Sequence, residues 1–323
     1  MSDPSATHAY LLDGAGAAQK VGVDEIAQWR EADGNLWVHL NYENVQAIDW
    51  LNGPAGLDPL IVGALLAEES RPRVATFGDG LLIALRGVNL NAGADPEDMV
   101  SIRIWIEANR IITTRKRELL SVADIEAQFE VSKGPCNSAE FIVDLIDRLI
   151  DRVCDVIDEL EDEVAELEAR VLDGDNGSLR YDLATVRRQA IAIRRYLSPQ
   201  REALSRLAAE KVSWLGESNR FHIREVNDRL IRSIEDLDVL RERAAVTQEE
   251  LQSRHAEQLN SRMYVLSVFA AIFLPLGFLT GLLGVNVGGI PGADHPGAFT
   301  IFVVSLIVLV ILQVVVFRWK KWM

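Results

Sequence analysis

The chain has 323 residues, a length that predicts two domains and enough chain for a sizeable soluble core. Its 33 basic and 48 acidic residues give a formal net charge of −15, so we expect no nucleic-acid partner. The two cysteines, Cys136 and Cys154, have no CxxC spacing, which argues against a disulfide framework or a thiolate zinc site and fits a reducing compartment.

The first ten residues, MSDPSATHAY, contain neither a basic n-region nor an apolar h-region. We therefore expect no cleavable signal peptide, and we expect the large N-terminal part of the chain to stay in the cytosol.

Residues 1–135 predict a cytosolic α/β domain. Short runs of β-branched or aromatic residues between turn residues predict strands at 36–40, 74–77, 81–88, 99–106 and 110–114. Helical spacing is found at 45–51 and 59–68. The sequence here has no Gly-rich phosphate loop, nucleophile elbow or His cluster, and His39 alternates with apolar neighbours as a core or edge histidine does. We therefore expect neither an enzyme nor a bound cofactor.

Residues 136–217 predict a helical hairpin. Its first helix, 139–171, carries an apolar seam with steps of three and four residues: Val143, Ile146, Ile150, Val153, Ile157, Leu160, Val164, Leu167 and Val171. An adjoining face carries seven carboxylates at the same steps: Asp144, Asp147, Asp151, Asp155, Asp158, Asp162 and Glu166. Residues 140–170 have a net charge of −9, whereas the return helix, 180–206, has a net charge of +5.

These opposite charges allow two compatible interpretations. In the simpler one, the two helices pair as an antiparallel hairpin and keep their charges on solvated rims. In the other, the carboxylate stripe attracts divalent cations, because hard cations prefer oxygen ligands and Asp residues one turn apart can supply them. The candidate metal ligands are then Asp147, Asp151, Asp155 and Asp158.

Residues 218–284 predict one long stalk helix, about 100 Å in length at 1.5 Å per residue. Leu230, Leu237, Ala244 and Leu251 recur every seven residues, which predicts association along this helix. Its single internal proline, Pro275, falls in an apolar stretch, and membrane helices tolerate proline when neighbours take over the freed backbone groups.

Two uncharged runs near the C-terminus predict two membrane crossings, at about 262–284 and at 298–317. Each run supplies the roughly 20 apolar residues that cross about 30 Å of hydrocarbon. The basic tail, 318–323, places both termini in the cytoplasm and the loop 285–297 outside, by the positive-inside rule. Two crossings cannot enclose a pore, so a pore would require several subunits.

The residues around the outer loop resemble a known family. Gly284-Val285-Asn286 ends the first crossing, Phe273-Leu274-Pro275-Leu276 lies inside it, and a basic tail with Trp follows the second crossing. Together these features resemble the CorA metal-ion transporter family, in which Gly-Met-Asn is the commoner signature. The longer string GVNVGGIPG is similar to the zinc-transporting branch of that family, called ZntB.

The resemblance implies a homopentameric funnel in the bacterial inner membrane, spanning it more than once per subunit. It also implies transport of a divalent cation, zinc in the first place and magnesium or cobalt as the alternative, without a resident cofactor. It gives Gly284, Val285 and Asn286 the role of selectivity residues. A membrane-anchored scaffold remains the alternative from another class, although a tether has no use for a proline, a glycine stripe and a sharp turn.

If the stalk helix lines an axial pore, helical spacing puts one stripe on the pore face: Asn260, Met263, Leu266, Ala270, Leu274, Gly277, Gly281 and Gly284. The crossing contains no Asp, Glu, His or Cys to replace the waters of an ion. We therefore expect the ion to pass hydrated, held by the Asn286 amide and the carbonyls of Gly284 and Val285. Leu266 and Leu274 would form hydrophobic constrictions.

Several of these residues also have a purely structural interpretation. Gly277 and Gly281 have the spacing that permits close packing of membrane helices. Gly284 and the residues after it also suit a helix end followed by a turn. In the outer loop, Asp294 and His295 are candidate contacts for a zinc ion that arrives from outside.

Overall fold

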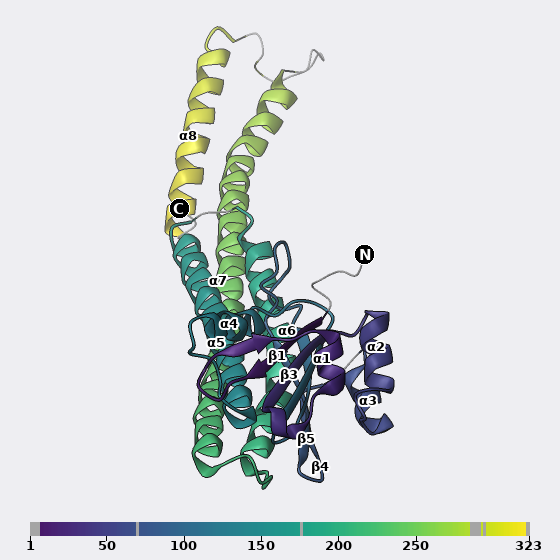
Figure 1. Cartoon of the computed structure of the whole chain (residues 1–323). Helices are drawn as coiled ribbons and strands as arrows, with labels where there is room; N and C mark the ends of the chain where they lie inside the picture. The colour runs from purple at the N-terminus through teal and green to yellow at the C-terminus, as the bar shows by residue number, and fades with distance from the viewer. Residues whose placement is uncertain (1–6, 69–70, 175–176, 285–291, 293–294, 321–323) are drawn as a thin grey trace. The chain divides into compact units, whose positions relative to one another are not determined.

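The structure, a computed structural model, describes residues 7–68, 71–174, 177–284, 292 and 295–320 (Figure 1). The chain divides into two compact units, 1–248 and 249–323, and each unit is considered by itself. The boundary falls inside one helix, α7 (Glu217–Leu283), which covers nearly the same residues as the predicted stalk.

Unit 1 contains a seven-stranded sheet with the order β2-β1-β3-β7-β6-β5-β4. The strands are β1 (Thr7–Leu12), β2 (Ala18–Lys20), β3 (Asn35–Asn41), β4 (Arg73–Phe77), β5 (Gly80–Gly87), β6 (Val100–Ile106) and β7 (Arg110–Arg115). Among the described strands, β3 and β7 pair in parallel and the other five pairs are antiparallel. The five predicted strands are confirmed as β3 to β7. The prediction missed β1 and β2, because a short hairpin at a sheet edge gains its pairing with β3 only in the folded chain.

Successive side chains of each strand point to opposite faces of the sheet, and both faces are buried. On one face, Leu36, Val38 and Leu40 of β3 belong to a core shared with α1 (Val23–Gln28), α2 (Val45–Asn52) and α3 (Pro59–Leu65). On the other face, Trp37 packs against Phe129 of α4 (Leu120–Glu130) and Phe141 of α5 (Ser138–Leu172). Figure 1 shows α2 and α3 on one side of the sheet and α4 and α5 on the other.

Polar residues define where several helices begin. Asn44 caps α2 and accepts hydrogen bonds from the backbone of Gln46 and Ala47. Asp58 caps α3, whose first residue is a proline, and Asn137 caps α5 by accepting a 3.0 Å bond from the backbone N–H of Glu140. These side chains satisfy amide groups that have no partner within the first helical turn.

The predicted helical hairpin is present as α5 and α6 (Leu179–Ala209). Eight residues of its predicted seam are buried, and Val143 is half-buried. The two helices pack against each other and keep their charged residues on outer faces, as the simpler interpretation predicted.

The heptad residues Leu230, Leu237 and Ala244 of α7 are also buried, but within a single chain. Ion pairs join this part of α7 to the hairpin of the same chain, through Asp151 of α5 and Arg194 of α6. Because these residues are already buried within one chain, the repeat is not by itself evidence for association along the stalk, which stays a prediction. The helices that cover these three residues are the chain's own α5 and α6.

One buried side chain ties the helical layer to the sheet. Gln200 of α6 accepts a 2.8 Å hydrogen bond from the backbone N–H of Arg86 and donates a 3.1 Å bond to the carbonyl of the same residue. Arg86 lies near the end of β5, so the amide extends the ladder of the sheet onto α6. This contact fixes which part of α6 lies beside the sheet edge.

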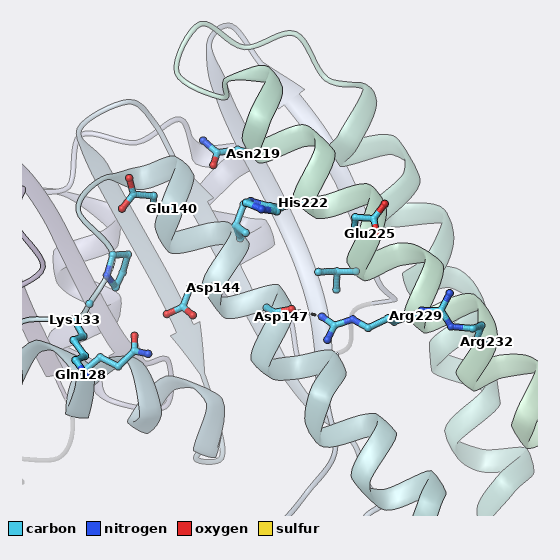
Figure 2. Close-up of a pocket in the computed structure, with 14 residues that line it drawn as sticks. Gln128, Lys133, Glu140, Asp144, Asp147, Asn219, His222, Glu225, Arg229 and Arg232 are labelled. Carbon is cyan, nitrogen blue, oxygen red and sulfur yellow. Dashed lines mark hydrogen bonds and ion pairs between the residues drawn. The ribbon is translucent and has the colours of Figure 1, made fainter.

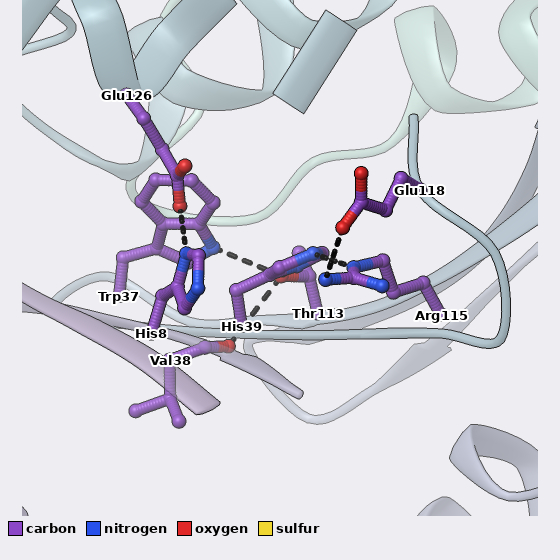
Figure 3. Close-up of polar contacts among 8 residues, drawn as sticks. All are labelled: His8, Trp37, Val38, His39, Thr113, Arg115, Glu118 and Glu126. Atoms are coloured by element: carbon purple, nitrogen blue, oxygen red, sulfur yellow. Dashed lines mark hydrogen bonds and ion pairs between the residues drawn. The ribbon is translucent and has the colours of Figure 1, made fainter. Parts of the chain in front are cut away.

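His39, which the sequence predicted to be a core or edge histidine, is buried in the core, with 3 % of its surface exposed (Figure 3). Its Nε2 accepts a 2.8 Å bond from Arg115 Nε, so the proton of the neutral ring sits on Nδ1 and is donated to Thr113 Oγ1 at 2.7 Å. The same hydroxyl accepts from Trp37 Nε1 and donates to the carbonyl of Val38. Every polar atom of this imidazole is thus satisfied in the neutral form.

Burial lowers the pKa of His39 well below its ordinary value of 6.5, and the charges of Arg115 and His8 lower it further. A lowered folded-state pKa stabilises the fold above pH 6.5, and this contribution is lost as the pH falls from about 6.5 toward the folded-state pKa. We predict that the melting temperature of the full-length protein falls between pH 7 and pH 5. His39→Gln should make that fall shallower, as measured by thermal unfolding monitored by tryptophan fluorescence.

The matched control is His222→Gln, because His222 is exposed on α7. This variant should keep the parent pH dependence. An unchanged slope in His39→Gln would show that other groups cause the acid sensitivity.

Candidate functional site

Two helices among the described residues are long and apolar enough to cross a membrane, the C-terminal part of α7 and α8 (Ala298–Trp319). The apolar segments, 263–283 in α7 and 298–317 in α8, contain no Asp, Glu, His or Cys. Large apolar side chains are exposed along both segments. A surface of this kind is stable only where lipid or another protein chain covers it.

Helix α8 covers one face of the apolar part of α7. The residues of α7 that become half-buried recur at helical spacing: Val268, Ala271, Ile272, Pro275, Leu276 and Leu279. At 100° per residue, the predicted pore stripe from Met263 to Gly284 lies on the opposite face, Asn260 lies between the two faces, and all members of the stripe are exposed. Met263, Leu266 and Leu274 are 67 %, 70 % and 73 % exposed. Within one chain, the predicted pore face is therefore open.

The helix passes through Pro275 without a break. Proline has no N–H, so the carbonyl of Ala271, four residues earlier, has no helical donor. Gln313 of α8 supplies one, since its Nε2 donates to the Ala271 oxygen at 3.5 Å. Inside hydrocarbon an unpaired carbonyl is costly, so this contact lets a proline persist in the crossing and fixes the register of α8 against α7.

We predict that Gln313→Leu destabilises the protein by about 1 kcal/mol, the usual size of a hydrogen bond between membrane helices. In a Pro275→Ala background, residue 275 regains its N–H and the Ala271 carbonyl regains its helical partner. Gln313→Leu should then cost almost nothing. The free energies of unfolding of the parent, the two single variants and the double variant, measured in detergent micelles, would give the coupling energy between Gln313 and Pro275. Equal costs in both backgrounds would show that Gln313 acts independently of the proline.

The C-terminal end of α7 is crowded at Gly284. A Cβ on Gly284 would lie 2.7 Å from the carbonyl oxygen of Thr280, so a larger residue would force the backbone to shift. The neighbouring candidates Val285, Asn286 and Asp294 lie outside the described residues. His295 accepts a 3.1 Å hydrogen bond from the backbone N–H of Gly297 through Nδ1. One nitrogen of this predicted zinc contact is thus used in the turn before α8.

The acidic stripe of α5 is partly neutralised by α7 and not by the basic helix. Arg229 of α7 lies between Asp147 and Asp151, with a distance of 2.6 Å from its Nη1 to Asp151 Oδ1, and it also contacts Asp147 (Figure 2). Asp155 and Asp158 are exposed. Among the described residues, the ion pairs of α5 with other helices lead to α4 and α7.

A hollow of about 720 Å³ lies beside this ion pair, between α5 and the first turns of α7. Figure 2 shows Glu140, Asp144 and Asp147 on its α5 side and His222 and Arg229 on its α7 side. Burial raises the pKa of Asp144, while Arg148 opposes the shift. In the parts of the chain that the structure describes, no three His, Cys, Asp or Glu side chains are grouped so that they could hold a metal ion. A cation at Asp147 and Asp151 would have to displace the Arg229 guanidinium.

Comparison with known proteins identifies the family. The family model described as "CorA-like Mg2+ transporter protein" matches residues 32–321 of the chain. The chain belongs to the CorA family of divalent-cation transporters.

Relatives within the CorA family match the chain over nearly its whole length. The divalent cation transporter CmaX of Pseudomonas aeruginosa is 40 % identical over 319 residues, covering 98 % of this chain and 96 % of the relative. The zinc transport protein ZntB of Yersinia pseudotuberculosis is 37 % identical over 318 residues, with the same coverage. The solved structure of full-length CmaX aligns with a TM-score of 0.87 and 39 % identity, covering 99 % of both chains.

The CorA fold brings together only part of what the sequence predicted. The stripe residues of α7 share one face, and Asp147 and Asp151 share one arginine partner. Sequence reasoning missed Arg229 and Gln313. Gln313 is the one amide side chain in the second crossing, and a polar residue in an apolar span signals a specific partner. Arg229 had no such signal, because its partners are about 80 positions away in the sequence.

Proposed function

We propose that this CorA-family chain carries a divalent cation across the plasma membrane through the axial pore of a homopentamer. The observation that supports this most is the open face of α7 opposite α8. It runs from Asn260 to Gly284 and is apolar or small between its ends. Five copies of this face around an axis would cover the exposed leucines and form a narrow, uncharged channel.

The proposed ion is zinc, with magnesium or cobalt as the alternative. Zinc is favoured by the string GVNVGGIPG and by relatives named as zinc transport proteins at 37 % identity. Magnesium is favoured by the description of the family model. A dehydrated zinc ion would need Cys, His or carboxylate ligands, and the crossings supply none between 263 and 283 or 298 and 317. We infer that the ion keeps its waters along this path.

In this proposal Gly284, Val285 and Asn286 form the selective mouth, and the ring of Asn286 amides holds the hydration shell of the ion. Leu266 and Leu274 are the hydrophobic constrictions. Their side chains are among the most exposed in the single chain, so they are free to point to a shared axis. Both chain ends lie in the cytoplasm, where Arg318 and Lys320 follow the second crossing.

Asn286→Ala tests the mouth. In liposomes containing the purified protein, zinc uptake should fall by at least about tenfold, because the amide that holds the hydrated ion is lost. Its mass in detergent should stay well above the 35.9 kDa of one chain and match that of the parent. Asn52→Ala, in the exposed end of α2, is the matched control and should transport normally. Parent-like uptake by Asn286→Ala would reduce this tripeptide to a turn.

Ion choice is tested in the same liposomes. Zinc and magnesium uptake are compared at two pH gradients, and we expect faster zinc uptake. Faster magnesium uptake would assign the chain to the alternative. A chain that sediments as a monomer or dimer and still transports would contradict the shared pore.

The acidic stripe should act as a diffuse attractant for cations. Asp155→Asn with Asp158→Asn removes two exposed charges and should lower flux by about threefold at ~0.01 M salt. At ~0.5 M salt the effect should nearly vanish, because screening then acts over about 4 Å. Adding Asp147→Asn and Asp151→Asn should lower the flux at low salt further.

The control for charge alone is Asp49→Asn with Asp95→Asn, two exposed acids of the α/β domain. It should leave flux unchanged at both salt concentrations. A stripe variant that conducts constantly, whatever the salt, would show that these residues hold a discrete regulatory metal.

A further inference from the structure

A second polar hollow, of about 360 Å³, lies in unit 1 at the edge of the sheet where the parallel strands β3 and β7 end. This size falls in the range of about 300–1,000 Å³ that is usual for small-molecule sites. Its lining includes five basic side chains: Arg86, Arg103, Lys116, Arg117 and Arg195. Among the described residues, three acids, Glu68, Glu97 and Asp98, and two tyrosines, Tyr42 and Tyr196, also line it. Basic side chains therefore outnumber acidic ones in the described lining, although the chain has a net charge of −15.

The register of the sheet gathers these cations. Arg86 of β5 pairs with Ser101 of β6, and Arg103 of β6 pairs with Thr114 of β7. Side chains two residues apart share a face, so Arg86 and Arg103 project to the same side of the sheet, and Lys116 follows directly after the end of β7. The contact of Gln200 with the backbone of Arg86 holds α6 beside this edge, and α6 brings Arg195 and Tyr196.

Arg103 is the most buried of the five cations, with 1 % of its surface exposed. Its Nη2 donates a 2.9 Å bond to the carbonyl of Glu68, and its guanidinium lies 4.8 Å from the ring centroid of Tyr42. Its Nε and Nη1 have no hydrogen-bond partner among the described residues. Burial lowers the pKa of Arg103, which Tyr42 partly offsets. A buried guanidinium with unpaired N–H groups is costly unless an anion satisfies it.

Two further arginines in the hollow have no carboxylate partner in the described part of the chain. Arg195 donates a 2.8 Å bond to the hydroxyl of Tyr196, and Arg117 is exposed. Lys116 already pairs with Glu43 at 2.7 Å, so it adds less. Arginine forks match the geometry of phosphate oxygens and bind them through paired, charge-assisted hydrogen bonds.

We propose that this hollow binds a small phosphate-bearing anion, through Arg103, Arg117 and Arg195. The site lies at the carboxyl ends of two parallel strands, where open α/β sheets commonly bind ligands. The Oε2 atom of Glu97 is buried and has no hydrogen-bond partner among the described residues. A carboxylate oxygen accepts hydrogen bonds, which indicates that the ligand also carries a donor such as a hydroxyl group. The free phosphate group of a metabolite and the phosphates of a nucleotide share this chemistry.

The test is isothermal titration of the full-length protein in detergent, with divalent cations removed, using inorganic pyrophosphate and ATP in separate titrations. We expect one bound ligand per chain. Arg117→Gln with Arg195→Gln should weaken binding by at least about tenfold, because each arginine would supply charge-assisted hydrogen bonds to the phosphate oxygens. Arg187→Gln is the matched control, because Arg187 is exposed on the same helix and does not line the hollow. It should bind like the parent.

Tighter binding of ATP than of pyrophosphate would identify a nucleotide, and equal binding would identify the phosphate group alone. Either result supports the site. Absence of binding at millimolar ligand would overturn it. A double variant that binds these ligands as tightly as the parent would also overturn it. So would chloride that displaces them as well as phosphate compounds do at the same ionic strength. Arg103→Gln should abolish binding, and its thermal unfolding shows whether the variant still folds.

Discussion

The structure depends on one constraint, the continuity of α7 across two solvents. Its 67 residues form a single helix that starts in a packed water-soluble layer and ends in a stretch suited to hydrocarbon. In the first part, buried residues such as Leu230 and Leu237 hold the helix against the chain's own hairpin. In the second part, no water is available to satisfy the backbone, so the helix must satisfy itself. The contact from Gln313 to the Ala271 carbonyl repairs the one place where Pro275 prevents this.

The division of α7 also decides where charge can lie. Acidic residues on α5 stand beside arginines of the soluble part of α7, and Arg229 neutralises two of them. The exposed carboxylates farther along α5 produce a negative electrostatic potential, which attracts cations in the nearby solution. The same chain has no acidic, basic, His or Cys side chain between 263 and 283 or between 298 and 317, in its membrane segments. The membrane segments lack side chains that could replace the waters of an ion, and the charged side chains lie in the water-exposed part of the chain. This distribution suits an ion that keeps its hydration shell.

The sheet carries a buried polar group on each of its faces, and the two are satisfied differently. On the face of α4 and α5, His39 is neutral and each of its nitrogens has a partner. On the opposite face, two N–H-bearing nitrogens of Arg103 have no hydrogen-bond partner among the residues that the structure describes, and they lie beside a hollow. A fully satisfied group rigidifies a core, whereas a buried group with unpaired N–H groups is costly unless a water molecule or an ion satisfies it. This difference separates a structural cluster from a candidate ligand site.

The sequence by itself determined the features that depend on local pattern. Two apolar runs predicted the crossings, β-branched runs predicted β3 to β7, and seam residues such as Ile150 and Leu160 predicted the face that α5 buries. These follow from periodicity and solvent preference, which each segment carries in its own residues. The resemblance around Gly284 gave the family, which the comparisons confirmed.

Only the tertiary structure decided which distant groups meet. Arg229 reaches Asp147 across 82 positions, and Arg86 and Arg195 reach the same hollow from different elements. It also decided that the heptad residues Leu230, Leu237 and Ala244 of α7 are buried within the chain itself, a pattern that by itself fits a neighbouring subunit equally well. The physical reason is the same in each case. A side chain fixes its own preference for water or core, whereas its partner depends on register, helix crossing and the residues that the rest of the chain brings to it.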